Sequence, residues 1–154
     1  MYFFKRALWY LITFWYALLR KKTVGARGLV IKDNQILLIT HTYQKGWCTI
    51  GGGINRGESP LQAAMREMYK EAGVIVQGKP ELFGVYHDTK DNRDDYVALY
   101  VVKDFLIEDV KSPEIAEKRW FPLNQLPEDT TPATVTTRRR IEEYLNLIPQ
   151  SDRW

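Results

Sequence analysis

The sequence has few of the residues that define several common functional classes. It contains one cysteine, Cys48, and two histidines, His41 and His87, among 154 residues. A single cysteine excludes an intrachain disulfide and fits a reducing, cytoplasmic compartment. The two histidines are far apart in the chain, and no Cys/His spacing typical of zinc sites is present. The chain therefore lacks the sequence features of a disulfide-stabilised or zinc-finger domain.

An excess of charge and the usual nucleotide-binding loops are also lacking. Lysine and arginine total 22 against 19 aspartates and glutamates, so the net charge is only +3. That charge is too small to indicate nucleic-acid binding by itself. Neither G-x4-G-K-[ST] nor G-x-G-x-x-G occurs, and no internal repeat is visible. The length fits one domain with a substantial core.

One segment departs from this picture of an ordinary soluble domain. The run from Ala7 to Leu19 is nearly all apolar or aromatic and has basic residues on both sides. It predicts an extra apolar helix over residues 1–22, ahead of a domain over residues 23–154. At about 1.5 Å per residue the run spans roughly 20 Å, short of a bilayer core of about 30 Å. Packing on its own domain or in a homodimer, contact with an anionic membrane surface, and a spanning or cleaved segment all remain open.

The rest of the chain alternates short apolar runs with polar turns. The runs 29–31 and 36–39 flank the turn 32–35, which indicates a β-hairpin. Apolar residues at helical spacing predict a late amphipathic helix over 133–147. Hairpins interrupted by one helix and closed by another indicate an α/β fold, with a mixed sheet between helices. Further short strands are expected at 47–50, 74–76, 82–86, 96–102 and 120–121, with a polar hairpin tip at 87–95.

The helix that interrupts the sheet has clear signals at both ends. Ser59 can serve as its N-cap, Pro60 suits the first helical position, and Gln62 completes a capping box. Gly73 can adopt the left-handed conformation that ends a helix. The pattern therefore predicts a helix from Pro60 to Ala72.

Two glutamates on this helix, Glu67 and Glu71, are four residues apart and so lie on one face. Such a pair repels itself unless a positive charge lies between, and a hard divalent cation prefers carboxylate oxygen. The plain alternative is a solvated helix face. The glycines at 51–53 favour the functional interpretation, because they let the backbone approach a ligand closely.

The stretch from Gly52 to Val74 reads G-x5-E-x7-R-E-φ-x-K-E-x-G-φ, where φ is apolar. It resembles the Nudix box, G-x5-E-x7-R-E-φ-x-E-E-x-G-φ, at every fixed position except Lys70. The resemblance implies a Nudix-like α/β/α sandwich. It also implies hydrolysis of a diphosphate linkage in a nucleoside diphosphate derivative, with Mg²⁺ or Mn²⁺ as cofactor.

The resemblance also implies roles for individual residues. Glu67 and Glu71 are the expected metal ligands, with the Gly52 carbonyl and Glu58 as further metal-site candidates. Arg66 is expected to orient Glu67 by a charge-assisted hydrogen bond. Glu67, Arg66 and Glu71 thus form the expected catalytic group. A general base from outside the box is also implied, and Glu114 and Glu117 are the candidates near the substrate.

Lys70 leaves the function open between two classes. An ammonium in place of a carboxylate could remove one metal of a two-metal site, hold substrate phosphate, or point into solvent. A metal-dependent pyrophosphohydrolase acting on a small nucleotide-like substrate is the main expectation. The alternative is a Nudix-fold nucleotide-binding or regulatory module with little turnover.

Overall fold

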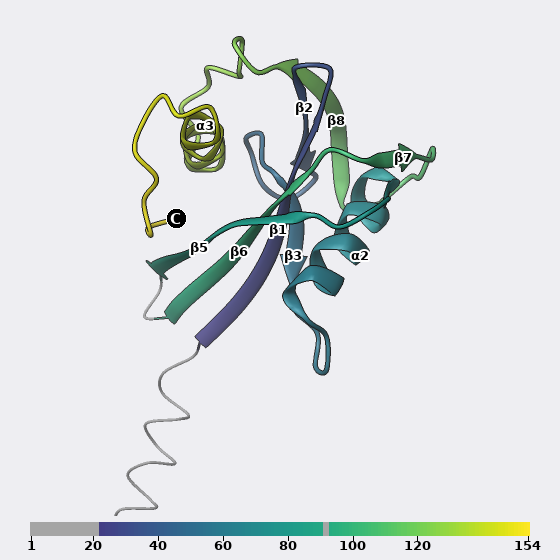
Figure 1. The fold of residues 1–154 in the computed structure, drawn as a ribbon, viewed down its shortest axis with the longest axis horizontal. Helices are drawn as coiled ribbons and strands as arrows, with labels where there is room; N and C mark the ends of the chain where they lie inside the picture. The colour runs from purple at the N-terminus through teal and green to yellow at the C-terminus, as the bar shows by residue number, and fades with distance from the viewer. Residues whose placement is uncertain (1–21, 91–92) are drawn as a thin grey trace, which may run out of the picture.

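The protein is a three-layer α/β/α sandwich. The computed structural model describes residues 22–90 and 93–154. Helix α2 (Pro60–Ala72) covers one face of a six-stranded mixed sheet, and helix α3 (Pro132–Tyr144) covers the other (Figure 1). This arrangement confirms the predicted fold class.

The sheet has the strand order β5-β6-β1-β2-β8, and β3 pairs with β1 beside β2. Only β1 and β6 run parallel; the other pairs in the sheet are antiparallel. A second, two-stranded sheet is formed by β4 and β7. The strands are β1 (Lys22–Lys32), β2 (Gln35–His41), β3 (Ile50–Gly53), β4 (Val74–Val76), β5 (Glu81–Lys90), β6 (Arg93–Val102), β7 (Phe105–Ile107) and β8 (Ile115–Pro122).

Alternating side chains on the strands build two separate cores. On β1, Ala26 and Val30 face α2, whereas Leu29 and Ile31 face α3. The same alternation continues on β2, because successive strand residues point to opposite faces. The predicted β1–β2 hairpin is confirmed, and its turn residues Asp33 and Asn34 have φ values of 50° and 58°. Two positive φ values are typical of the type I′ turn that suits a two-residue hairpin loop.

Helix α2 begins and ends as its sequence predicts. Ser59 accepts a hydrogen bond from the Gln62 N–H and the Gln62 side chain accepts from the Ser59 N–H, while Gly73 closes the helix at φ 74°. The Met68 side chain of α2 packs directly on β1 at Gly28. A Cβ on Gly28 would lie 2.4 Å from the Met68 sulfur.

Several elements differ from the sequence-based expectation. The strand expected at 47–50 is Ile50–Gly53 instead, so the glycines form a strand rather than a loop. β7 was not predicted, and the segment expected to be a polar tip continues β5 and β6. β1 already begins at Lys22, and the remainder of the apolar helix expected at 1–22 lies outside the described residues. Within the described part of the chain, no helix is long and apolar enough to cross a membrane.

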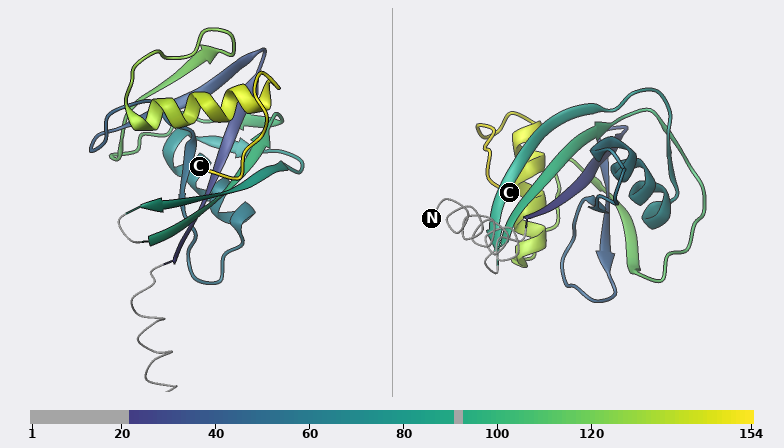
Figure 2. Two further views of the ribbon diagram at one scale, coloured as in Figure 1. Left: turned by 90° about the vertical axis from the view of Figure 1, so that its left-hand side faces the viewer. Right: turned by 90° about the horizontal axis from the view of Figure 1, so that it is seen from below.

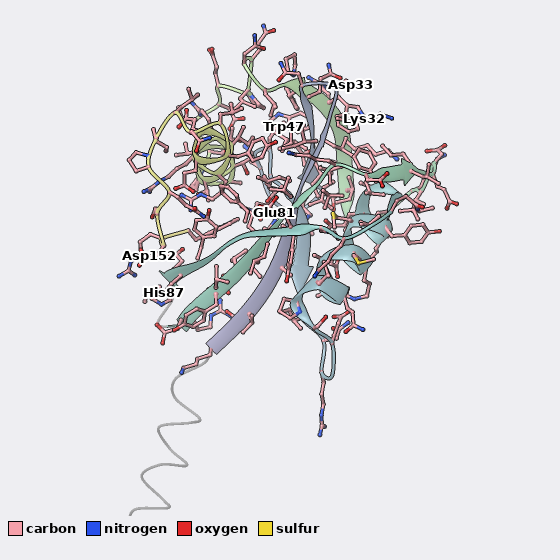
Figure 3. All side chains as sticks on the ribbon, viewed as in Figure 1. Lys32, Asp33, Trp47, Glu81, His87 and Asp152 are labelled. Carbon is pink, nitrogen blue, oxygen red and sulfur yellow. The ribbon has the colours of Figure 1, made fainter. Side chains whose placement is uncertain are left out.

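The carboxyl-terminal tail returns to the sheet beside α3 (Figure 2). The His87 N–H donates to the Asp152 carbonyl at 2.8 Å, and the Trp154 N–H donates to the His87 carbonyl at 3.0 Å. His87 and Asp152 lie next to each other at one end of β5 (Figure 3). Under the tail, Arg140 is fully buried, with its guanidinium 4.3 Å from the centre of the Tyr86 ring. Arg140 therefore belongs to the core and not to a solvated helix face.

Candidate active site

The two glutamates that the sequence placed on one face of α2 are both buried. Glu67 is 7% exposed and Glu71 is 3% exposed. They face β3, where the Gly51 N–H donates to Glu71 Oε2 at 3.1 Å. The Glu67 carboxyl packs against Gly52, because a Cβ there would lie 3.0 Å from Glu67 Cδ. Two carboxylates are thus held against the glycine backbone of one strand.

Two of the three glycines of β3 are required for this arrangement. Gly51 has φ +152°, and a Cβ on it would lie 2.2 Å from the Ala26 carbonyl oxygen. A side chain on Gly52 would press on Glu67. Gly53 differs from both, since a Cβ there would meet nothing within 4 Å. The tight fit between α2 and β1–β3 therefore depends on Gly51 and Gly52 specifically.

Arg66 connects the start of α2 to the acidic pair. Its Nε donates to Glu58 Oε1 at 2.7 Å and its Nη2 donates to Glu58 Oε2 at 2.8 Å, a bidentate pair. Nη2 also donates to the Gly53 carbonyl at 2.9 Å, and Nη1 donates to Glu67 Oε1. The hydrogen bond from Arg66 and the one from the Asn55 N–H lower the pKa of Glu58 to about 2. The expected Arg66–Glu67 contact is present, and Glu58 is occupied by Arg66.

Lys70, which stands where the box usually has a carboxylate, lies between two glutamates. Its Nζ is 3.0 Å from Glu114 Oε1 and 3.8 Å from Glu67 Oε2. The hydrogen bond to Glu114 is the main cause that raises the pKa of Lys70. The Thr42 N–H donates to the Glu114 carbonyl at 2.9 Å, which fixes the segment before β8 next to the end of β2. Glu114 therefore lies beside the acidic pair.

Glu117 has its contacts on the other face of the sheet. It pairs with Thr40 in the β2–β8 ladder and binds the Arg119 guanidinium. Arg119 in turn lies over the rings of Trp47 and Phe121, on the α3 side. Trp47 lies between the sheet and α3 (Figure 3), and its backbone N–H donates to the Thr134 hydroxyl at 2.8 Å. Of the two candidates for a base, the structure brings only Glu114 to the acidic pair.

His41 is a site residue that the sequence analysis did not identify. Its Nε2 lies 3.4 Å from Glu71 Oε1, and its Nδ1 lies 3.5 Å from Cys48 Sγ. The signal was present but weak: His41 continues the alternation of Leu37 and Ile39, which face α2. Only the packing of β2 against α2 brings the imidazole to Glu71.

The buried acidic pair fits a hard divalent cation. Burial is the largest cause that raises the pKa of Glu71, and the nearby Glu67 charge adds to it, while the Gly51 N–H and His41 oppose it. A cation would relieve this unfavourable burial of two negative charges. Across residues 22–90 and 93–154, no group of three or more His, Cys, Asp or Glu side chains could hold a metal. Two carboxylates supplemented by other oxygens suit Mg²⁺, which is usually bound through one or two carboxylates plus water and substrate phosphate.

Comparison with known proteins agrees with this geometry. The family model of the NUDIX domain matches residues 21–143, most of the chain. The chain belongs to the Nudix family. A Nudix hydrolase of the MutT type from Burkholderia pseudomallei has a similar structure, with a TM-score of 0.67, 24% identity, and coverage of 78% of this chain and 98% of that one.

Relatives within the Nudix family differ in what they are named for. An ADP-ribose pyrophosphatase of Methanocaldococcus jannaschii is 32% identical over 117 residues, 73% of this chain and 69% of that protein. An m7GpppN-mRNA hydrolase of Caenorhabditis elegans is 31% identical over 125 residues, 72% of this chain but only 15% of that protein. Diphosphoinositol polyphosphate phosphohydrolase 3-alpha of Mus musculus is 35% identical over 96 residues, 60% of this chain and 57% of that protein. The chain therefore spans only part of the worm and mouse proteins.

Proposed function

We propose that this Nudix protein hydrolyses a diphosphate linkage in a nucleoside diphosphate derivative, with a divalent cation held by Glu67 and Glu71. The observation that carries the proposal is the buried pair of carboxylates packed against Gly51 and Gly52, at 7% and 3% exposure. Arg66 and Lys70 lie against Glu67, whereas no lysine or arginine among the described residues pairs with Glu71, and a buried carboxylate without a cation is costly. A site that accepts this cost is suited to a cation and its phosphate ligand.

Each residue of the site has a defined task in this proposal. Glu67, Glu71 and the Gly52 carbonyl supply hard oxygen ligands, and Arg66 orients Glu67 while Glu58 holds Arg66 in place. When bound, Mg²⁺ or Mn²⁺ neutralises diphosphate charge and lowers the pKa of a coordinated water.

Glu114 is the candidate proton acceptor, because its carboxylate is about half exposed and Lys70 holds it beside the acidic pair. Lys70 contributes positive charge at the edge of the site, where it can also meet a substrate phosphate.

The names of the relatives support the class of reaction more strongly than they support any single substrate. Their names refer to ADP-ribose, to capped mRNA and to diphosphoinositol polyphosphates. A nucleotide derivative is favoured by the first two. The choice within this class requires a direct assay.

A second function, nucleotide binding with little turnover, is favoured by one contact. Arg66 pairs with Oε1 of Glu67 and Lys70 pairs with its Oε2, so two cations already neutralise this carboxylate. A cation must compete with both, and weak metal binding would leave a binding module.

The test is a screen of nucleoside diphosphate derivatives with Mg²⁺ and Mn²⁺, following mononucleotide release. Glu67→Gln and Glu71→Gln should each lower turnover by at least about a hundredfold with the fold intact, since metal stabilisation of transition-state charge contributes several kcal/mol. Glu117→Gln is the matched control and should keep full turnover. Nucleotide binding without turnover across the whole panel would favour the second function. Near-normal turnover in both site variants would refute the first.

A further inference from the structure

His41 joins two buried groups that the proposed reaction does not otherwise connect. The imidazole lies between the Cys48 thiol and the Glu71 carboxylate, at 3.5 Å from Nδ1 and 3.4 Å from Nε2. The side chains of His41 and Glu71 are only 6% and 3% exposed. The Tyr43 ring, which is exposed, lies 4.9 Å from the imidazole ring. This line of side chains leads from the core to a proposed metal ligand.

The direction of each hydrogen bond follows from the donors available. A carboxylate can only accept, so His41 Nε2 must carry the hydrogen in the contact with Glu71. In the neutral imidazole, Nδ1 is then an acceptor. The Cys48 thiol, whose pKa burial raises, lies 3.5 Å from this nitrogen and 3.5 Å from the Ile39 carbonyl oxygen, so its one hydrogen can go to either acceptor. The contact with Glu71 thus favours a hydrogen on Nε2.

The β2–β8 ladder also changes register at this residue. The pairing shifts between Thr40 and His41, so that Ile115 pairs with His41 while Glu117 pairs with Thr40. An extra residue in one strand re-aims the neighbouring side chains, and such bulges are frequent next to active sites. Here the shift occurs where β2 meets the acidic pair of α2. The extra residue is Ala116 on β8, opposite His41, while β2 itself keeps its regular alternation.

We propose that His41 is a positioning residue: its Nε2–H holds Glu71 Oε1 while Cys48 holds Nδ1. The proposal rests on the proposed function, since it concerns Glu71 as a metal ligand. Glu71 Oε2 is already held by the Gly51 N–H. With both oxygens anchored, one from β2 and one from β3, the flexible glutamate presents its remaining lone pairs in one fixed direction. Partners of this kind usually contribute about 10- to 100-fold to metal affinity.

The first test compares two substitutions of His41 by calorimetric titration of Mg²⁺ and Mn²⁺ into the full chain. His41→Leu removes the donor and should weaken metal binding at least tenfold. His41→Gln keeps an amide N–H at similar reach and should stay within about threefold of the unsubstituted protein. His87→Leu and His87→Gln are the matched controls, because the partners of His87 are Asp94 and Arg153 on other elements. Thermal unfolding of each variant separates a loss of fold from a loss of metal affinity.

Equal metal affinity in His41→Leu and the unsubstituted protein would overturn the proposal. It would also be overturned if His41→Gln bound metal as weakly as His41→Leu in a folded state, because size alone would then explain the loss. For any substrate that is turned over, the loss in His41→Leu should fall on kcat and metal affinity, with KM for the substrate nearly unchanged.

The second test needs no turnover and no folded His41 variant. Imidazole nitrogen shifts from NMR report the tautomer of each histidine, and His87→Gln assigns the two sets of signals. His41 should carry a hydrogen on Nε2, and Cys48→Val should reduce the share of that form. An Nδ1–H tautomer, or a tautomer unaffected by Cys48→Val, would overturn the arrangement. Because this result does not depend on hydrolysis, failure of the proposed function and failure of this inference can be told apart.

Discussion

Lys70 provides the sharpest electrostatic test of the site. Its ammonium lies 3.8 Å from Glu67 Oε2, so it competes directly with any cation for that oxygen. Replacing it with methionine keeps an unbranched side chain that is one atom shorter and removes the charge. Replacing it with glutamate restores the carboxylate that the Nudix box usually has at this position. Both changes should tighten Mg²⁺ binding, and the second should do so more.

The magnitude follows from the distance and the exposure. Unit charges 3.8 Å apart interact by about 1 kcal/mol at the dielectric constant of water and by about 4 kcal/mol at an effective dielectric of about 20. The Lys70 side chain is 46% exposed, which places its effect near the lower value. We therefore expect Lys70→Met to tighten Mg²⁺ binding about tenfold, which corresponds to about 1.4 kcal/mol. Lys70→Glu reverses the charge and should add up to a further tenfold before salt screening.

Calorimetric titration of Mg²⁺ and Mn²⁺ at low and high ionic strength measures this effect. The difference between the proteins should shrink as salt rises, since exposed charges are screened. Lys79→Met is the matched control: it makes the same substitution at an exposed residue of the turn between β4 and β5. Unchanged or weaker metal affinity in both Lys70 variants would refute the reasoning. It would mean that Glu67 Oε2 is not a ligand.

Three further predictions concern the structure around the site. Gly51→Ala should destabilise the protein by about 2 kcal/mol or more in urea unfolding, because it combines strain at φ +152° with a clash on the Ala26 carbonyl. Gly53→Ala is the control and should change stability little, because a Cβ there has free space. Equal losses of stability in the two variants would contradict this prediction. The pKa of Glu58 in the folded protein is about 2, below the ordinary 4.5, so its contribution to the free energy of unfolding is present above pH 4.5 and is lost as pH falls toward 2. Glu58→Gln should therefore flatten the dependence of stability on pH between these values. An unchanged slope in acid unfolding would contradict this prediction. Arg140→Ala should cost about 3–5 kcal/mol of unfolding free energy, because it removes the nearer and buried cation of Glu143, at 3.0 Å. Arg139→Ala removes the half-exposed cation that lies 3.9 Å from Glu143 and should cost little. A small loss for Arg140→Ala would show that the buried pair is dispensable.

Local signals in the sequence were sufficient for the elements that the chain builds from its own neighbours. The boundaries of α2 follow from Ser59, Pro60 and Gly73, which act within a few residues of the helix ends. The helical spacing also places Glu67 and Glu71 together without knowledge of the rest of the fold. The β1–β2 hairpin follows from apolar runs around a short turn.

Features that depend on distant partners could not be predicted in this way. The glycines of β3 become a strand only because β1 pairs with them, and β7 is short and forms only against β4. Arg140 stands in a run of arginines, but it is buried because its guanidinium packs on the Tyr86 ring and pairs with Glu143.

Which residues meet at the site likewise could not be predicted from the sequence alone. Glu114 and Glu117 look alike in the sequence, yet Glu114 lies in the turn before β8 and meets Lys70, whereas Glu117 lies within β8 and meets Arg119. The contact between His41 and Glu71 likewise exists only once β2 packs against α2.

The central claim is that Glu67 and Glu71 hold the same divalent cation. Titration of Mn²⁺ followed by electron paramagnetic resonance, with Glu67→Gln, Glu71→Gln and the double variant, tests it most directly. Ligands of one ion act as a unit, so their effects should not add. We predict that each single variant binds Mn²⁺ at least tenfold more weakly and that the double variant is little worse than the weaker single one, with Glu117→Gln unchanged. Unaltered Mn²⁺ affinity in the double variant would contradict the claim.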